Sequence, residues 1–533
     1  MNLTINWLAI IPLAIVLGAG VVGTLLEAFL PRNIRRAVQI ALSLLALGSA
    51  FVAIIWRWSD LAGAKTPGML RPLSFSKGAA FSGVSLVEDG FSILGQTVIV
   101  VCAFLSFMLI ADRTSLRDGS FAASAATRPG SAAEQESTEA GREQTEIFPL
   151  ALFATGGMMA FVSAFDLLSL FIALELLSLP LYVLSATARR RRLLSQEAAL
   201  KYFLLGAFSS AIFLMGAAFI YGATGTLSFY GVAVLAQKQQ IIALFLAIGV
   251  ILLVVGLLFK VGAAPFHSWT PDVYQGAPTP ITAFMAAGTK TAAFIAMVRV
   301  FVWIVMAVPD TFRIFMWIII IATVVIGTVM GLVQTDIKRL LAYSSIAHAG
   351  FILIAVKATL AHVQGIQLAA LNSIVFYLLA YGLATVGAFG VVTLIRSKDS
   401  EGNILGEATS LSNWAGLGKR SPFLASAMVI FLLSFAGIPL TAGFIGKFEA
   451  FATGIAAGDV VLVVIAIIAS VATAFFYFRL IQLMFFTEAE EDTIEIATSE
   501  GLSVVAISVA LAGTIVLGIF PSPILEFIAG TFQ

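Results

Sequence analysis

Four ionisable side chains lie deep inside apolar stretches of this chain, and their types favour proton exchange. Glu175 lies about nine residues into "DLLSLFIALELLSLPLYVL", which is roughly 14 Å along a helix that rises 1.5 Å per residue. Lys260, Lys290 and Lys447 lie in three further apolar stretches. A charge near the bilayer centre costs about 2.5 to 3.5 kcal/mol, so each demands a reason. Because desolvation favours a neutral lysine and a nearby carboxylate favours a charged one, such groups could load and release a proton.

The alternative for these four residues is a set of structural ion pairs that orient helices. One carboxylate and three lysines cannot all be neutralised in pairs, which favours proton exchange. Three accessory candidates carry alternatives of their own. Lys201 could extend from a nearby loop to the headgroups, His267 could hydrogen-bond a carbonyl freed by a broken helix, and His348 could be a buried histidine satisfied by its neighbours.

Two of the lysines lie beside Gly/Pro interruptions of apolar segments. One segment is "FKVGAAPFHSWTPDVYQGAPTP", with its break at Gly262 and Pro265 in the range 260–278. The other is "FAGIPLTAGFIGKFEAF", with its break at Gly437 and Pro439 in the range 437–447. Irregular backbone is tolerated at membrane depth only where protein covers it or where it lines a wet cavity. Paired broken helices therefore predict a transporter with inverted repeats and sites near the midplane.

The elements that carry these residues predict an all-α polytopic membrane protein. Of the 533 residues, 60% are apolar and 11% are charged, against about 25% charged in soluble domains. About fourteen spans of roughly 20 apolar residues can be counted. We predict three N-terminal helices in 1–111, a polar cytoplasmic loop in 112–146, a first repeat in 147–306, a second repeat in 312–486, and an acidic loop with a final helix in 487–533.

Basic residues gather in alternate loops, which predicts the orientation. "PRNIRR", "ARRRRLLSQE", "TDIKR" and "GKRSP" belong to one set of loops, while the other set holds scattered single cations. Since cytoplasmic loops carry the excess of Lys and Arg, the first set faces the cytoplasm and both termini lie on the outer side.

Composition and motifs exclude several function classes. A net charge of +1 gives no support for a nucleic-acid partner. The single cysteine, Cys102, excludes an intrachain disulfide, a cysteine zinc cluster and an iron–sulfur site. Neither a phosphate loop nor a dinucleotide fingerprint is present, and no clustered His/Cys set could bind a metal. We therefore expect energy from an ion gradient or from neighbouring subunits.

Five motifs in the range 147–486 closely resemble the antiporter-like membrane subunits of proton-pumping NADH:quinone oxidoreductase, respiratory complex I. They are "DLLSLFIALELLSLPLYVLSA", "EAALKYFLLGAFSSAIFLMGAAFIYGATGTLSF", "FKVGAAPFHSWTPDVYQGAPTPITAFMAAGTKTAAF", "QTDIKRLLAYSSIAHAGF" and "SFAGIPLTAGFIGKFEAF". The resemblance implies about fourteen transmembrane helices with two inverted five-helix repeats, each containing a discontinuous helix. It also implies roles for the following residues: Glu175 and Lys260 as the pair of the first half-channel, Lys290 as the central lysine, Lys447 as the terminal residue, His348 as a relay, and Lys201 and His267 as accessory members.

The resemblance further implies a setting for the chain. NADH, FMN, iron–sulfur clusters and quinone would lie in other subunits of a proton-translocating enzyme. The neighbours would be the antiporter-like subunit M, the small K- and J-type subunits and lipids of the inner (plasma) membrane. Lysine at 447 and the short C-terminal tail favour the N-type over the M- and L-types. The alternatives are an Mrp-type cation/proton antiporter subunit, which shares these motifs, and a non-conducting scaffold.

Two features depart from the family pattern. The insertion 112–146 is longer than expected, and its small and charged residues without periodicity predict a surface loop. The eleventh span carries Tyr377 and Tyr381 but no buried charge. The expected path from Lys290 to Lys447 then depends on His348 and water.

Overall fold

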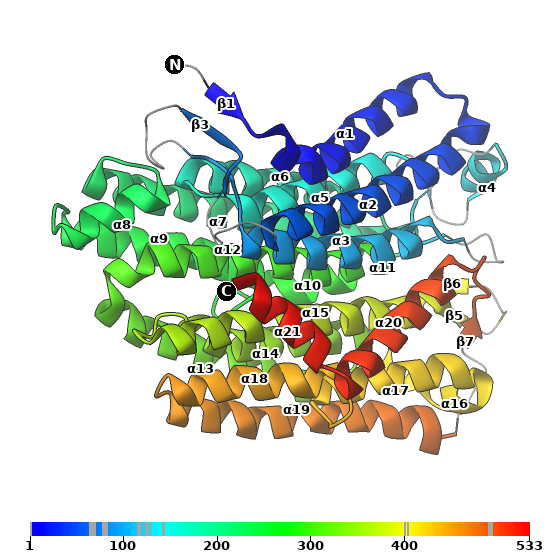
Figure 1. Ribbon diagram of the computed structural model, residues 1–533. Coiled ribbons are helices and arrows are strands. Elements are labelled where there is room, and N and C mark those ends of the chain that lie inside the picture. The colour runs from blue at the N-terminus through cyan, green and yellow to red at the C-terminus, as the bar shows by residue number, and fades with distance from the viewer. Residues whose placement is uncertain are drawn as a thin grey trace.

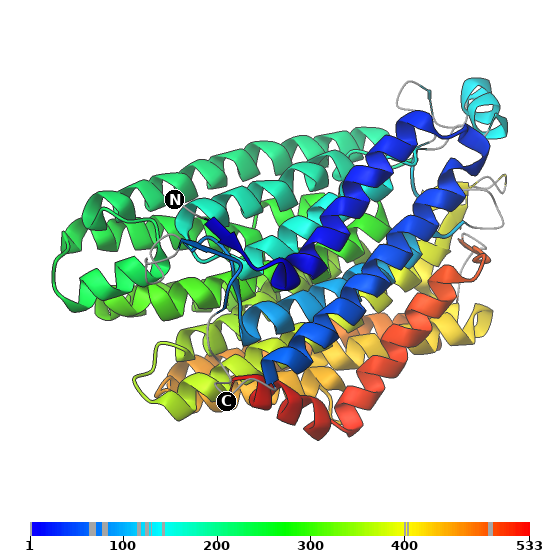
Figure 2. The same cartoon turned by 45° about the horizontal axis from the view of Figure 1, so that its top comes forward.

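The computed structural model of the chain describes residues 3–62, 71–76, 84–113, 119–122, 127–128, 131–140, 144–398, 401, 404–488 and 494–532. Long helices run side by side along most of this part of the chain (Figures 1 and 2). Twelve of its helices are long and apolar enough to cross a membrane. Two predicted spans correspond to shorter helices, Ile147–Ser163 and the broken unit that begins with Pro422–Ala436. The prediction of an all-α polytopic membrane protein is confirmed.

The N-terminal region supplies three long helices and two short strand pairs. Strand β1 pairs with β3, and β2 pairs with β4, both antiparallel. Helix α3 is the most enclosed of the three long helices, because it packs against α5, α11, α15 and α20. The elements are β1 (Leu3–Ile5), α1 (Trp7–Phe29), α2 (Arg32–Ala62), β2 (Arg71–Pro72), β3 (Ser74–Ser76), β4 (Val87–Glu88) and α3 (Gly90–Ala111).

Two series of helices follow, and they lie in the upper and lower parts of Figure 1. In each series the fourth spanning unit is broken. The first series is α5 (Ile147–Ser163), α6 (Leu167–Ser185), α7 (Arg192–Thr224), the short α8 (Phe229–Gln237), α9 (Ala243–Val261) with α10 (Trp269–Gly276), and α11 (Thr279–Phe284) with η1 (Met285–Thr289), α12 (Lys290–Trp303) and η2 (Val305–Ala307). The second is α13 (Pro309–Leu332), α14 (Ile337–Ala358), α15 (Gln364–Leu394), α17 (Pro422–Ala436) with α18 (Ala442–Ala456), and α19 (Val460–Phe486). The proposed boundaries of the repeats stay a prediction.

Both breaks begin at a glycine in the left-handed region. Gly262 ends α9 with φ +74°, and Gly437 ends α17 with φ +79°. Glycine adopts this conformation without the steric cost that a Cβ atom adds. After each break the chain crosses a short irregular segment before α10 or α18 begins.

The basic loops meet at one end of the bundle. Arg36 donates to the carbonyl of Ala111 at 2.5 Å, and Arg191 donates to Thr409 at 2.8 Å, although these partners lie far apart in the sequence. A three-stranded antiparallel sheet at this end has the order β6–β5–β7. The small elements here are β5 (Ile395–Lys398), β6 (Ile404–Glu407), η3 (Leu411–Trp414), α16 (Leu417–Arg420) and β7 (Ile494–Ile496). These contacts support the predicted grouping of loops on a common side.

Short helices occur where none was predicted, among them α8, α4 and α21. Helix α4 (Ala132–Glu139) lies inside the insertion 112–146. It begins with a serine followed three residues later by a glutamate, and the Glu134 amide donates to the Ser131 hydroxyl at 3.3 Å. That spacing is a known signal for a helix start. Much of 112–146 lies outside the described residues.

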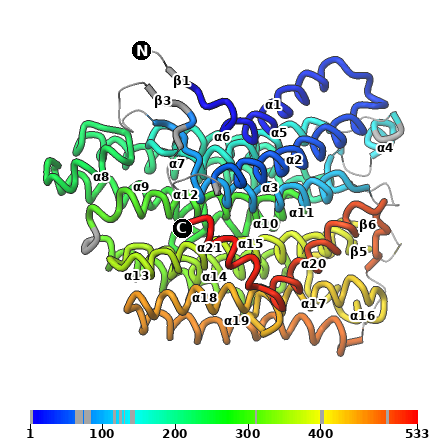
Figure 3. Tube along the Cα trace, viewed as in Figure 1, coloured from blue at the N-terminus to red at the C-terminus, as the bar shows by residue number. Residues whose placement is uncertain are grey.

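Another unpredicted helix, α21 (Ser522–Phe532), follows the last spanning helix α20 (Leu502–Ile519). It folds back on the bundle, as the chain trace shows (Figure 3). Its Thr531 accepts a hydrogen bond from Trp58 at 3.0 Å, and the rings of Trp58 and Phe527 are 4.5 Å apart. The C-terminal segment therefore packs against the N-terminal helices.

A buried ion pair joins the N-terminal helices to the first series. Arg299 of α12 binds both carboxylate oxygens of Asp89, at 2.8 and 2.9 Å, and donates to the Val162 carbonyl at 3.0 Å. Asp89 also caps α3 by accepting from the Ser92 amide at 2.8 Å. Arg299 is 2% exposed. Bidentate pairs of this kind fix geometry, so this pair sets the position of α3 against α12.

Replacing Arg299 with leucine should strongly destabilise the protein, because it leaves the Asp89 carboxylate buried without its partner. Breaking a buried pair from one side costs about 3–5 kcal/mol. The measurement is the thermal midpoint of the detergent-solubilised protein, with exposed Arg313→Leu as the matched control. The double variant Arg299→Leu with Asp89→Asn should recover much of the loss. Equal midpoints for Arg299→Leu and Arg313→Leu would contradict the assignment.

Candidate functional site

Lys260 lies at the end of α9, immediately before the break, and is held by aromatic rings. Its side chain is buried, and within the described chain its Nζ atom has no hydrogen-bond partner. Nζ lies 5.6 Å from the ring centre of Tyr182 and 5.4 Å from that of Tyr202. Trp269 stacks on Tyr202 and donates its indole N–H to the Phe259 carbonyl at 2.9 Å. The aromatic residues thus surround the amine and satisfy one carbonyl freed by the break.

Glu175 of α6 is not in direct contact with Lys260. One of its carboxylate oxygens accepts a hydrogen bond from Ser210 of α7. No ion pair within 4.0 Å joins the two residues, both of which the structure describes. Tyr182, two turns after Glu175 on the same helix, presents its ring to Lys260. The predicted pair is therefore separated here, and direct pairing requires a side chain to move.

The two accessory residues of the first series, Lys201 and His267, are less buried than Lys260. The Lys201 side chain is 44% exposed and pairs with Glu197 at 2.7 Å and with Asp272 at 2.8 Å. This geometry favours the alternative of an interfacial lysine. His267 is partly exposed in the turn between α9 and α10. Its side chain forms a hydrogen bond with the backbone of Pro265 in the break, which favours the alternative that His267 satisfies the broken helix.

Lys290 begins α12 immediately after the π-helical turn η1, an irregularity that is frequent at functional sites. Its Nζ donates to the Ser345 carbonyl at 2.5 Å and to the Ser345 hydroxyl. The amine also lies 5.1 Å from the ring centre of Tyr381. Lys290 is buried, and its partners are neutral oxygens and an aromatic face.

His348 connects the surroundings of Lys290 to those of Lys447. Its Nδ1 lies 2.8 Å from the Tyr377 hydroxyl, and its Nε2 lies 3.5 Å from the Tyr477 hydroxyl. Its ring centre is 5.1 Å from that of Tyr381 and 5.6 Å from that of Phe435. The two tyrosines of the eleventh span therefore have positions in the site, although they add no charge.

Lys447 of α18 caps the open end of α17, the other half of the same broken helix. Its Nζ donates to the carbonyls of Phe435 at 2.8 Å and Ala436 at 3.0 Å, and to the Ser470 hydroxyl at 2.8 Å. These are the last two residues of α17. Cations are favoured at helix C-termini, where the free carbonyls carry partial negative charge. A Cβ atom on Gly437 would lie 2.9 Å from Lys447 Cδ, so glycine is needed for this approach.

The structure thus gathers most of the predicted residues into a row of buried groups across both series. Lys260, Lys290, His348 and Lys447 are each at most 5% exposed, and Glu175 lies at one end. Sequence reasoning missed their neutral partners, since hydroxyl and aromatic residues in an apolar stretch resemble ordinary core. The missed partners are Tyr182, Tyr202, Ser210, Ser345, Ser470 and Tyr477. No cluster of three His, Cys, Asp or Glu side chains that could hold a metal occurs in the described ranges.

The chain has close relatives in sequence and in structure. Residues 164–473 match the family described as NADH:quinone oxidoreductase/Mrp antiporter, TM. The chain is 50% identical to NADH-quinone oxidoreductase subunit N of Beutenbergia cavernae, over 98% of this chain and 97% of that relative. It is 46% identical to subunit N of Mycobacterium tuberculosis, over 98% and 97% of the two chains.

Two solved structures show the same fold. A chain of respiratory complex I from Thermus thermophilus with bound aureothin is 33% identical, with a TM-score of 0.75 over 97% of this chain and 99% of that one. A chain of the Mrp complex from Dietzia sp. has a TM-score of 0.77 at 19% identity, over 98% and 97%. These findings confirm the resemblance that the motifs indicated, and the chain belongs to the NADH:quinone oxidoreductase/Mrp antiporter family of membrane proteins.

Proposed function

We propose that this chain is the N-type, proton-translocating membrane subunit of an NADH:quinone oxidoreductase. It moves protons through Glu175, Lys260, Lys290, His348 and Lys447, driven by quinone reduction elsewhere in the complex. The observation that carries the proposal is a row of three buried lysines without carboxylate partners, two of them at helix breaks. The full-length relatives named subunit N support it.

The proposal includes the setting of the chain. NADH, FMN, iron–sulfur clusters and quinone belong to other subunits, so the redox chemistry occurs outside this chain. Its neighbours are subunit M, the K- and J-type subunits and the lipids of the plasma membrane. Both termini lie on the outer side, which agrees with the basic loops gathered at the opposite end of the bundle.

The electrostatic energies in the first half-channel are large enough to couple movement of the Glu175 carboxylate to proton release by Lys260. At an effective dielectric constant of about 20, two unit charges attract by about 4 kcal/mol at 4 Å and by about half of that at 8 Å. Moving one charge against 100 mV costs about 2.3 kcal/mol. A shift of the Glu175 carboxylate between contact with Lys260 and its bond to Ser210 therefore changes the affinity of Lys260 for a proton by a comparable amount.

The transfers then follow the row of residues. Lys260 loses its proton when Glu175 moves away, and Lys290 receives it through water. A role for His267 in this step stays a prediction, as does one for Lys201 at the entrance. His348, between the Tyr377 and Tyr477 hydroxyls, relays the next transfer to Lys447. Lys447 releases a proton toward the outer side when its hold on the α17 carbonyls is broken.

The two alternatives have less support. An Mrp-type antiporter shares the fold, but the Dietzia Mrp chain is only 19% identical, whereas relatives named subunit N are 46–50% identical. A passive scaffold could use Lys447 to cap α17, but it gives no reason to bury Lys260, whose amine has no hydrogen-bond partner in the described chain. Sodium-dependent transport without a co-purified NADH-oxidising arm would favour the first alternative.

Lys260→Ala should lower proton pumping coupled to NADH oxidation while leaving assembly largely intact, because the change removes the carrier and leaves the helix break in place. Pumping is measured from acidification of inverted membrane vesicles. Assembly is measured from NADH oxidation with an artificial electron acceptor. The exposed Lys238→Ala is the control. Unchanged pumping in an assembled Lys260→Ala complex would refute the role of Lys260.

Gly437→Ala should impair pumping more than Gly458→Ala does. Both glycines have positive φ, +79° and +85°, so alanine brings a similar backbone cost of about 1–2 kcal/mol at each. Only at Gly437 does the new methyl group meet Lys447, and nothing lies within 4 Å at Gly458. The readout is pumping per assembled complex. Equal effects of the two substitutions would show that the contact between Gly437 and Lys447 is unimportant.

A further inference from the structure

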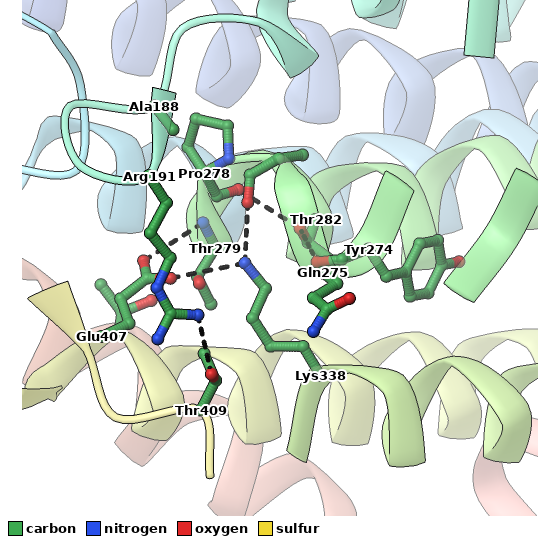
Figure 4. A network of polar contacts seen from close by, with 12 residues as sticks. Ala188, Arg191, Tyr274, Gln275, Pro278, Thr279, Thr282, Lys338, Glu407 and Thr409 are labelled. Atoms are coloured by element: carbon green, nitrogen blue, oxygen red, sulfur yellow. Dashed lines mark hydrogen bonds and ion pairs between the residues drawn. The ribbon is translucent and has the colours of Figure 1, made fainter. Parts of the chain in front are cut away.

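A polar network at the basic-loop end of the bundle is not part of the row described above. At its centre is Lys338, whose side chain is 1% exposed although it lies in the first turn of α14. Its Nζ donates to the Ala277 carbonyl at 2.7 Å and lies 3.4 Å from Glu407 Oε2. Figure 4 shows α14, the turn between α10 and α11, and strand β6 meeting at this point. The side chain of Glu407 is 16% exposed, so it connects the buried amine to solvent.

A small cavity adjoins the network. It has a volume of about 30 Å³ and is lined by Arg191, Ala277, Lys338 and Glu407, among others. A water molecule requires about 10–15 Å³ of such space and two or more polar partners. The cavity therefore has room and partners for water beside the Lys338 amine.

The network continues inward toward Lys290. Ser345, the hydrogen-bond partner of Lys290, is seven residues after Lys338 on α14, about 10.5 Å along the same helix face. The side chain of Tyr274 interacts with Ser345 from α10. Thr282 donates to the Tyr274 carbonyl at 3.2 Å. The polar groups between Lys338 and Ser345 thus come from α10, α11 and α14.

Thr279 connects Glu407 to the turn between α10 and α11. Thr279 is fully buried, its backbone amide lies 3.4 Å from Glu407 Oε1, and its side chain also interacts with that carboxylate. Buried hydroxyl groups are normally paired with protein or water. Thr279 lies beside Pro278. The Pro278 carbonyl lies 3.3 Å from the Thr282 hydroxyl, which also donates to the Tyr274 carbonyl. Polar groups therefore continue from Glu407 to the serine that holds Lys290.

We propose that Glu407 and Lys338 form a proton-uptake site that supplies Lys290 from the basic-loop end, separately from the Glu175–Lys260 pair. The inference depends on the proposed function, because it assigns an entrance to that path. A neutral Lys338 amine takes a proton from a cavity water, and the hydroxide left behind takes a proton from solvent past Glu407. After Lys290 has passed its own proton on, the Lys338 ammonium gives its proton to water on the Ser345 side, and that water gives a proton to the neutral Lys290 amine. In each step an N–H and an O–H bond are exchanged, so no further reactant is needed.

The charges around Glu407 suit this role. Lys338 and Arg396 face its carboxylate at 3.4 and 4.0 Å, and Arg191 and Asp336 lie on the adjoining elements. Burial acts to raise the pKa of Glu407, but the charges of Lys338 and Arg396 outweigh it and hold this pKa below its ordinary value. The carboxylate is therefore ionised at neutral pH and stabilises the ammonium form of Lys338.

The test is chemical rescue in the purified complex. Glu407→Ala should slow NADH oxidation by a soluble quinone by about tenfold or more, the usual effect of removing a proton-transfer group. Acetate, a carboxylate small enough for the space left by the side chain, should restore much of the rate. Glu495→Ala in β7 is the matched control, since Glu495 is a more exposed carboxylate of the same sheet. Its rate, and that of the parent complex, should not respond to acetate.

The outcomes separate this inference from the proposed function. A Glu407→Ala complex that oxidises NADH normally, or that is slow and not rescued by acetate, overturns the uptake site, because the site requires a carboxylate beside Lys338 for turnover. If Glu407→Ala assembles poorly, Glu407→Gln keeps the shape and should still be slow, and normal turnover of Glu407→Gln also overturns it. Lys260→Ala runs in parallel. If only Lys260→Ala has a defect, the proposed function stands and the uptake site does not. If neither Lys260→Ala nor Glu407→Ala has a defect, both the proposed function and the uptake site are contradicted.

Discussion

The interior of this bundle depends on one constraint, which is that hydrocarbon offers no partner for a charge or for an open backbone carbonyl. Each of the two breaks exposes carbonyls, and each has a lysine beside it. At the second break, Lys447 satisfies the carbonyls of Phe435 and Ala436 directly. At the first, Trp269 takes the carbonyl of Phe259, and Lys260 is left to aromatic faces.

This difference between the breaks gives the two lysines different partners. The Lys447 amine donates to two carbonyl groups at the end of α17 and to the Ser470 hydroxyl. Lys260 receives only the weaker attraction of ring faces, worth about 0.5–2 kcal/mol. Its charge therefore depends on where the Glu175 carboxylate lies, and the Ser210 hydroxyl competes for that carboxylate. The first half can therefore respond to movement of the Glu175 carboxylate, while Lys447 is held in place by its hydrogen bonds.

Much of the fold could be predicted from single stretches of sequence. Span length, apolar content and the Gly/Pro interruptions at 262 and 437 gave the helices and their breaks, because each of these depends on local backbone chemistry. The short helices α4 and α21 were not predicted. A capping signal at Ser131 and Glu134 was present for α4, but the polar composition of the insertion obscured it. Helix α21 is stabilised by tertiary contacts such as the ring packing of Trp58 and Phe527.

The sequence by itself determined which residues carry charge at membrane depth, since burying Glu175, Lys260, Lys290 or Lys447 in an apolar span is costly wherever the helices pack. Only the tertiary structure decided their partners. Ser345 for Lys290, the α17 carbonyls for Lys447 and the separation of Glu175 from Lys260 all depend on how distant helices cross. Neutral oxygens and aromatic rings are common in any helix, so their residue types alone do not mark them as part of the site. They belong to it because the packing of the helices places them against the lysines.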